Sequence, residues 1–456
     1  MDEFIRRAEY TIRPDYCKGQ NYIHKKIVLN SLIAEKMLAL EAGSDNELSR
    51  NEEFQNYLRG RKEQAMRQWY YYQEAYNEVI PDTAEIKKEF AVAGRTYKIS
   101  YFTLPLNNSQ EKIREWLKHD ATAFDTIFKE VAGAENAMPQ KEIGYDKPED
   151  EQIYAQLFLN PVQQGQLIGP LEMADGTQLV LRVDGWTDDL ALSAQQIQER
   201  WRTVKENITN RMAMDIYERK VLEIMKGKRL EFNRDVFFKL ADIVAADYYK
   251  TEEEKKQSFN KKFWNEDRDE MVLDDRSSQL ESIRDQQLFT VDGQVWTVGA
   301  FERELQSHPL VFRQRRFPRN RFAEQFKLAI VDMVRDKYIT AAAYQKDYDK
   351  VVAVERNFRM WQDNLLALYQ KHTYVNSLKT QAKDQLQIIT EELNPYVQRL
   401  FKKYSNDIKI DVKKFEEIQL TGVDMFVIQR NVPFPVVVPG FPQLTTHDRL
   451  DYGQKM

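Results

Sequence analysis

The chain has 456 residues and a formal net charge of −5 at pH 7, with 42% hydrophobic and 30% charged residues. These totals exclude a disordered or fibrous protein, and the length predicts about two to four domains. The small negative charge gives no general reason to expect nucleic acid as a partner. No apolar run approaches the roughly 20 residues that cross a bilayer.

The beginning of the chain reads as a helix, MDEFIRRAEY, with no charged-then-apolar leader in front of it. Either the protein is cytosolic, or a leader and a first strand lie upstream of Met1, and we favour the second alternative. The single cysteine, Cys17, excludes an internal disulfide framework. No nucleotide, zinc-protease or serine-hydrolase motif occurs, so the sequence implies no cofactor.

Two segments with different predicted secondary structure make up the first part of the chain. Residues 1–90 read as helices, because apolar residues recur at helical spacing in KKIVLNSLIAEKMLALEA and Gly43 follows as a stop. Residues 91–188 begin with a strand, YKISYFTL, continue with helices and end with LVLRV behind the turn Asp175-Gly176. Strand, helices and then strands predict an α+β domain.

A long helix follows in residues 189–245. Ser193 and Gln196 form a capping-box pattern at its start, and a short strand-and-helix unit comes after it. Residues 246–285 are dense in charge and poor in periodicity, which predicts a linker.

The last two segments differ in character. Residues 286–420 open with a hairpin, FTVDGQVWTV, whose turn is Asp292-Gly293, and continue as a second helical domain. Residues 421–456 contain NVPFPVVVPGFPQL, and its prolines predict an extended tail.

Two parts of the chain share a similar residue pattern, which we call the echo, and this indicates an internal duplication. Three apolar positions match at a constant offset of 178: Leu230, Phe232 and Phe237 with Ile408, Ile410 and Phe415. A weaker echo links DEFIRRA with GAFEREL, and LIAEKML with MVRDKYI. In the second copy a hairpin precedes Phe301, whereas Phe4 in the first lies too near the start for one. This is why we expect residues upstream of Met1.

The order of these parts resembles the SurA, PrsA and PpiD group of secreted chaperones, over about residues 1–245. MDEFIRRAEY followed by YIHKKIVLNSLIAEKMLALEA is similar to the N-terminal chaperone segment of that group. The resemblance implies a predominantly helical α+β fold. Residues 1–90 and 189–245 would form helical chaperone arms around a parvulin-like (PpiC-type) insert at 91–188, with a second SurA N-like repeat at 286–420.

The parvulin resemblance also points to a site, and this site is degenerate. Parvulins carry a histidine on each of two strands, and Tyr101 and Gln178 stand in those places here. The segment VAGAENAMPQ lacks the expected cysteine or aspartate, and Glu149 replaces a usual methionine, whereas Ile153 and Phe158 keep the apolar wall that would bind substrate. Rotating an X–Pro bond crosses a barrier of about 18–20 kcal/mol, and lowering it requires placed hydrogen-bond donors. We expect weak or no isomerase activity, supported at most by a Tyr101–Gln178 hydrogen bond.

Aromatic residues make up 12% of the chain, and the run WYYYQEAY offers Trp69, Tyr70 and Tyr72 as a surface for unfolded chains. The resemblance implies a periplasmic or secreted chaperone whose partners are unfolded or nascent exported proteins, outer-membrane proteins among them. An active isomerase with an altered site and a structural subunit with a fixed partner are the alternatives. The arginine-rich run VFRQRRFPRNRF is either a solvated loop with ion pairs or a contact for an acidic partner or membrane surface.

Overall fold

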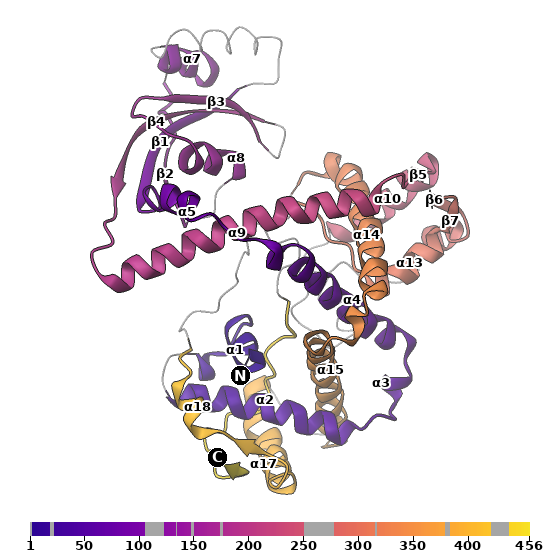
Figure 1. Ribbon diagram of the computed structural model, residues 1–456. Helices are drawn as coiled ribbons and strands as arrows, with labels where there is room; N and C mark the ends of the chain where they lie inside the picture. The colour runs from indigo at the N-terminus through magenta and orange to yellow at the C-terminus, as the bar shows by residue number, and fades with distance from the viewer. Residues whose placement is uncertain are drawn as a thin grey trace. The chain divides into compact units, whose positions relative to one another are not determined.

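The computed structural model is predominantly helical with small β-sheets, which confirms that the fold is α+β and mostly helical (Figure 1). The residues that it describes are 2–18, 22–104, 123–133, 135–146, 150–173, 177–249, 278–314, 317–378, 384–420 and 437–456. The chain forms two compact units. One comprises Met1–Glu74 with Tyr217–Met456, and we call it the helical unit; the other, Ala75–Ile216, is the insert unit.

The insert unit contains a four-stranded sheet in the order β2-β1-β4-β3, and each neighbouring pair is antiparallel. Its strands are β1 (Arg95–Leu104), β2 (Gln140–Gly144), β3 (Leu167–Glu172) and β4 (Gln178–Asp188). Its helices are α5 (Thr83–Phe90), α7 (Ala123–Ala132), α8 (Glu151–Tyr154) with the π-helical turn Ala155–Leu159, and the first part of α9 (Ala194–Met225). The predicted α+β insert at 91–188 lies within this unit, which also takes in α5 and part of α9.

Strand alternation gives the sheet two different apolar faces. One face carries Ile99 and Leu181, which pack in one core with residues of α5, α8, the π-helical turn and α9. The other carries Phe102 and Val180, which pack against Phe124 of α7. α7 accordingly lies on one side of the sheet and α5 and α8 on the other (Figure 1).

The capping box predicted for α9 is confirmed. The backbone N–H of Gln196 donates to the Ser193 hydroxyl at 3.1 Å, and the N–H of Ser193 donates back to the Gln196 side chain at 3.0 Å. Both orphan donors are thus satisfied, which fixes the start of this 32-residue helix.

The helical unit holds the remaining elements. Its helices are α1 (Asp2–Glu9), α2 (Tyr22–Ala42), α3 (Glu47–Arg50), α4 (Glu52–Glu74), the end of α9, α10 (Arg234–Tyr248), α12 (Ser278–Ile283), α13 (Val298–Ser307), α14 (Phe322–Gln345), α15 (Val352–Leu378), α16 (Gln385–Gln387) with the π-helical turn Ile388–Leu393, α17 (Asn394–Lys403) and α18 (Val412–Glu417). Its strands are β5 (Leu230–Phe232), β6 (Gln287–Val291), β7 (Gln294–Thr297), β8 (Lys409–Ile410) and β9 (Gln454–Lys455).

The predicted hairpin is confirmed as β6–β7. Its turn residues Asp292 and Gly293 have φ angles of 49° and 78°, the left-handed conformation that a tight hairpin turn requires. The equivalent prediction for Asp175-Gly176 falls outside the described residues, and so does most of the predicted linker at 246–285, between α10 and α12.

The duplicated strand-and-helix units are both present, but each packs against the other copy. β5 and α10 end the first copy, yet they pack with β6, α13 and α14 of the second in what we call the hairpin core. β8 and α18 end the second copy, yet they contribute with α1 and α2 to what we call the tail core. The two copies thus exchange their last elements within the helical unit, which holds both residues 1–74 and residues 217–245.

The extended tail is confirmed for residues 437–456, which contain no helix. β9 pairs in parallel with β8, and the tail is anchored on α2 through Asn30. The Asn30 amide donates to the carbonyls of His447 and Arg449 at 2.7 and 3.0 Å, and Tyr452 donates to the Asn30 side-chain oxygen at 2.6 Å. Residues 421–436 lie outside the described part of the chain.

Candidate functional site

The structure does not bring the two predicted isomerase positions together. Tyr101 of β1 is opposite Leu181, whereas Gln178 of β4 is opposite Leu104. Because successive side chains of a strand point to opposite faces, Tyr101 lies on the face packed against α8 and Gln178 on the face packed against α7. A hydrogen bond between Tyr101 and Gln178 is therefore not formed.

A polar network lies on the same face of the sheet as Gln178. The Ser100 hydroxyl donates to Asp184 at 2.6 Å, and Arg182 binds Asp184 at 3.1 Å and Asp125 at 2.9 Å. Burial lowers the pKa of Arg182, but the hydrogen bonds that it donates to Asp125 and Asp184 outweigh burial and raise that pKa overall. The guanidinium is thus a charged group already committed to two carboxylates. The side-chain oxygen of Gln178 is buried without a partner among the described residues.

The residues of the predicted apolar wall are core residues. Ile153 is 5% exposed and Phe158 is 3% exposed. The Phe158 ring lies 5.2 Å from the ring of Tyr97 and 5.4 Å from that of Tyr145, between the π-helical turn and the sheet. Neither side chain offers a surface on which a proline ring could bind. Glu149 falls outside the described residues.

A second buried polar cluster joins α5, α9 and the loop after β2. Glu89 accepts a hydrogen bond from Tyr145 at 3.0 Å and forms an ion pair with Arg211. Burial raises the pKa of Tyr145, and also that of Tyr154, the latter to about 12. Both phenols therefore stay protonated at neutral pH. Each charge here has a partner, which indicates a structural cluster.

The α4 rings that were predicted to bind unfolded chains are divided between core and surface. Tyr70 is buried, Trp69 is half-buried, and Tyr72 is 42% exposed with its ring 5.6 Å from that of Trp69. The run is therefore only partly buried. Most other rings of the helical unit serve its cores, as Phe289 and Phe301 do in the hairpin core.

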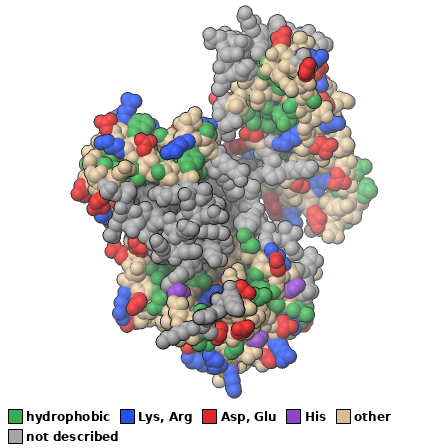
Figure 2. Space-filling model, turned by 180° about the vertical axis from the view of Figure 1, so that it is seen from behind, with side chains coloured by type: hydrophobic (Ala, Val, Ile, Leu, Met, Phe, Trp, Pro, Cys, Tyr) green, Lys and Arg blue, Asp and Glu red, His purple; other side chains and the backbone are tan. Residues whose placement is uncertain are grey.

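The described part of the arginine-rich run forms ion pairs within the protein. Arg313 binds Asp332 at 2.8 Å, and this hydrogen bond raises the pKa of Arg313. Arg321 binds Glu324 at 3.2 Å, while Arg315 and Arg316 lie outside the described residues. Figure 2 shows Lys and Arg side chains mixed with Asp and Glu over the visible face. The solvated-loop interpretation is the one these contacts support.

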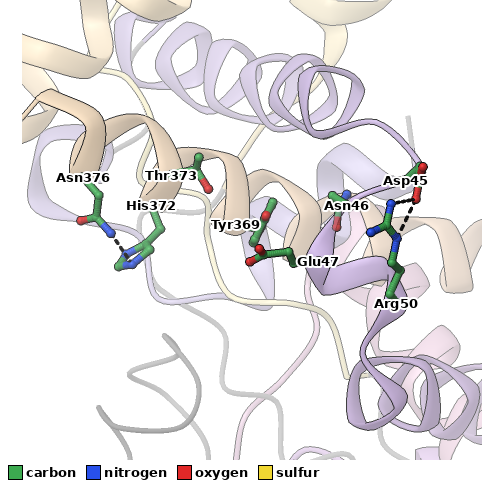
Figure 3. A pocket seen from close by; sticks show the side chains of 8 residues that line it. All are labelled: Asp45, Asn46, Glu47, Arg50, Tyr369, His372, Thr373 and Asn376. Carbon is green, nitrogen blue, oxygen red and sulfur yellow. Dashed lines mark hydrogen bonds and ion pairs between the residues drawn. The ribbon is translucent and has the colours of Figure 1, made fainter.

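A polar depression of about 670 Å³ lies between α3 and α15 (Figure 3). Arg50 points to Asp45 at one end, and Asn376 points to His372 at the other, at 2.6 Å. Burial lowers the pKa of His372, so its ring is neutral at pH 7. Since these groups pair with one another instead of converging on a common point, the arrangement does not resemble a catalytic site.

An apolar groove of about 480 Å³ lies within the helical unit, between α1, α2, β8 and α18. We call it the acceptor groove. Its lining is mostly apolar and charged residues stand around it: Phe4, Leu29, Ile33, Lys36, Met37, Leu40, Tyr404, Asp407, Ile408, Lys409, Ile410, Asp411, Lys414, Phe415 and Ile418. Leu40 is 62% exposed, although it belongs to a helix whose other apolar residues are largely buried. The groove therefore leaves apolar surface accessible beside a strand.

The sequence interpretation missed this groove. The signal that could have found it is the internal echo, because Ile408, Ile410 and Phe415 line the groove and match Leu230, Phe232 and Phe237 in the other copy. Among the described residues there is no group of three or more His, Cys, Asp and Glu that could hold a metal ion.

In the part of the chain described by the structure, none of the helices is both long and apolar enough to cross a membrane. Comparison with protein-family models, with curated protein sequences and with solved structures finds no match for this chain.

Proposed function

We propose that the protein is an extracytoplasmic holdase-type chaperone that binds unfolded exported proteins, with an insert unit of weak or no prolyl isomerase activity. The observation that carries this proposal is the acceptor groove, whose apolar lining includes the exposed side chain of Leu40 next to the backbone of a short strand. An unfolded β-rich chain presents the complementary features: alternating apolar side chains and unpaired backbone groups.

The groove's chemistry favours weak and broad binding. Its floor consists of aliphatic and aromatic side chains such as Leu29 and Phe4, and Lys36, Lys409 and Lys414 stand at its margin with Asp407 and Asp411. Apolar contact depends little on client sequence, and charges of both signs tolerate clients of either charge. A stoichiometric holdase needs such tolerance, whereas a structural subunit with one partner would need a larger and more specific surface.

The insert unit favours the holdase over the isomerase. Its Arg182 is committed to Asp125 and Asp184, and Tyr101 and Gln178 lie on opposite faces of the sheet. In the sequence of the unit, the only histidine is His119, which lies outside the described residues. An isomerase needs hydrogen-bond donors placed around a twisted amide, and this sheet does not bring such donors together at one point.

The test is a pair of measurements on the full chain. Light scattering should show that the protein suppresses aggregation of a urea-unfolded outer-membrane β-barrel protein and of an unrelated β-rich client at near-stoichiometric ratios. Suppression of neither client, together with one tight complex with a single partner, would instead favour the structural subunit.

The second measurement is turnover of a proline-containing peptide. We expect the rate to stay at the uncatalysed background in both the wild type and Gln178→Ala. Catalysis well above background that disappears in Gln178→Ala would overturn the ranking in favour of an active isomerase with an altered site.

A further inference from the structure

The tail, residues 437–456, is held by the helical unit in the way that a protein holds an extended peptide. It contains no helix, and its strand β9 pairs with β8 and not with another part of the tail. The hairpin of the other core, in contrast, folds back on itself at Asp292-Gly293. The extended conformation of the tail is therefore set by the surface beneath it, as the conformation of a bound peptide is.

Most of the hydrogen bonds that hold the tail are made to its main chain. The carbonyl of Gly440 accepts from Arg7 at 2.8 Å, and that of Gln443 accepts from Lys371 at 3.3 Å. The Asn30 amide donates to two further tail carbonyls. Because every polypeptide carries the same main-chain groups, these donors recognise an extended chain without reading its sequence.

Four helices supply the polar side chains of this surface. Arg7 lies on α1, Asn30 on α2, Lys371 on α15 and Asn394 on α17. The Asn394 side-chain oxygen accepts from the N–H of Thr446 at 3.1 Å. We call these four residues, with the apolar pockets between their helices, the tail-binding surface. It belongs entirely to the helical unit.

Apolar side chains of the tail fill the pockets. Leu444 is fully buried, Phe441 is 8% exposed, and the ring of Tyr452 stacks on that of Phe401 at 3.9 Å between centroids. Side-chain hydrogen bonds to the surface are fewer: they come from the hydroxyl of Tyr452 and from two threonines. The surface thus suits an extended chain with apolar residues at intervals, which is the chemistry of an unfolded β-rich protein.

The tail-binding surface does not depend on the tail for its charge balance. Arg7 is fully buried and binds Glu35 at 2.7 Å, and Glu35 also accepts from Asn364 at 2.7 Å. The tail contributes only the carbonyl of Gly440 to this network. Removing one partner of a buried ion pair is costly because it leaves a charge unpaired. Departure of the tail leaves no such charge, and another carbonyl can replace that of Gly440.

The tail-binding surface adjoins the acceptor groove at β8. β9 donates to the carbonyls of residues 408 and 410 at 2.8 and 3.0 Å, whereas Asp407, Lys409 and Asp411 line the groove. Successive carbonyls of a strand point to opposite edges, so the tail and the groove lie on opposite edges of β8. In the hairpin core, β6 pairs with the edge of β5 that corresponds to the groove side.

We propose that the tail-binding surface is a binding site for extended polypeptide segments, and that the tail is its internal competitor, which a segment of an unfolded client displaces. This rests on the proposed chaperone function and names a binding site and its regulation. A segment attached to the same chain competes at a high effective concentration. Single short peptides would therefore be held off, whereas an unfolded protein, which offers many segments, would displace the tail.

The first test weakens the tail without altering the surface that holds it. Tyr452→Ala removes the ring stacked on Phe401. A fluorescein-labelled peptide of residues 437–456 should then bind the full-length variant about tenfold more tightly than it binds the wild type, by fluorescence anisotropy. Adding Asn30→Ala, which removes the donor to two carbonyls, should weaken this binding about tenfold. The milder Tyr452→Phe should give a smaller gain.

The second test prevents the tail from leaving. Lys409 and Gln454 are paired residues of β8 and β9, and neighbouring strands lie about 4.8 Å apart, within disulfide range. Oxidised Lys409→Cys/Gln454→Cys should suppress aggregation of a urea-unfolded outer-membrane β-barrel protein less than its reduced form does. Thr290→Cys/Val295→Cys, which ties paired residues of the hairpin, is the matched control, and oxidation should not change its suppression. The native Cys17 is fully buried.

The outcomes separate the site from the function. Equal suppression by the oxidised and reduced forms would overturn the proposal, because the tail would then be a permanent part of the core. So would the absence of any gain in peptide binding in both Tyr452 variants. Peptide binding that the unfolded client does not compete for would show that the surface takes only the tail, and a dimer of Tyr452→Ala would assign it to the tail of a second copy. Absence of suppression by every form would remove the proposed function, and the peptide measurements would still decide whether the surface binds extended chains.

Discussion

The hairpin core and the tail core begin from the same local pattern and are completed differently. In both, a short strand leads into a helix that carries a buried phenylalanine, Phe237 in one and Phe415 in the other. In the hairpin core β6 pairs with the strand and β7 pairs with β6, whereas in the tail core the C-terminal tail pairs with the opposite edge of β8. The comparison shows that a local motif specifies its own strand and helix, while the segment that packs on them decides whether the surface they form is buried or left accessible.

The largest expected effect comes from removing the side chain that fills the hairpin core. Phe289 is fully buried, so Phe289→Ala should lower the free energy of unfolding by about 3–5 kcal/mol through lost burial and a cavity. Val295→Ala on β7 is the control, since Val295 is 58% exposed, and should change it by less than about 0.5 kcal/mol. Urea unfolding monitored by circular dichroism measures both. Equal effects would show that the hairpin does not complete this core.

The second prediction uses a buried acid that each copy carries at the same place. Glu35 binds Arg7 at 2.7 Å in the tail core, and its counterpart Asp336 binds Arg335 at 3.0 Å and His308 at 3.2 Å, and lies 3.5 Å from Arg67. Asp336→Asn would remove the strongest countercharge of the buried Arg67, so we expect a loss of about 3 kcal/mol at pH 7.

The pH dependence of Asp336 sharpens this test. Burial raises its pKa, but the His308 hydrogen bond and the charges of Arg67 and Arg335 outweigh burial, so its folded pKa lies below the ordinary value. The stabilisation is therefore present above the unfolded pKa of about 3.9 and is lost as pH falls through the lower folded value. The difference in stability between wild type and Asp336→Asn should shrink on acidification below about pH 4. A difference that is constant with pH would contradict this.

The third prediction concerns what holds the tail on α2. Asn30 is fully buried, and Asn30→Ala would leave the carbonyls of His447 and Arg449 without their donor, which should cost about 1–3 kcal/mol. Tyr452→Phe is the milder variant, because it keeps the ring stacked on Phe401 at 3.9 Å and removes only the hydroxyl. Hydrogen exchange of β9 should rise in both and rise more in Asn30→Ala. Unchanged exchange would mean that other contacts hold the tail.

Several elements could be predicted from the sequence because their signals are local. The capping box at Ser193 starts α9, Asp292-Gly293 makes the hairpin turn, and the prolines keep the tail extended. The echo also located both strand-and-helix units. The exchange of strand-and-helix units between the two copies could not be predicted. An apolar residue such as Phe237 or Phe415 indicates that its position will be buried, but it does not indicate which segment will cover it.

The candidate site was harder still to predict. Tyr101 and Gln178 were chosen by their places in two strands, but whether two strand residues share a face depends on the pairing register. Shifting one strand by one residue would move each of its side chains to the other face of the sheet. The sequence of either strand alone does not set this register. The acceptor groove is formed by segments more than 400 residues apart in sequence, Phe4 and Phe415 among them, so it emerges only from the fold.

The smallest expected effect on stability comes from breaking an ion pair of the arginine-rich run. It tests whether an exposed ion pair contributes less than a buried one. Arg313 is half-exposed and binds Asp332, itself only partly buried, so Arg313→Ala should cost less than about 1 kcal/mol, with the difference vanishing in high salt. The comparison with Asp336→Asn is direct, because both remove one partner of an ion pair and differ mainly in burial. If Arg313→Ala cost as much as Asp336→Asn, desolvation would not be the reason that the buried acid matters.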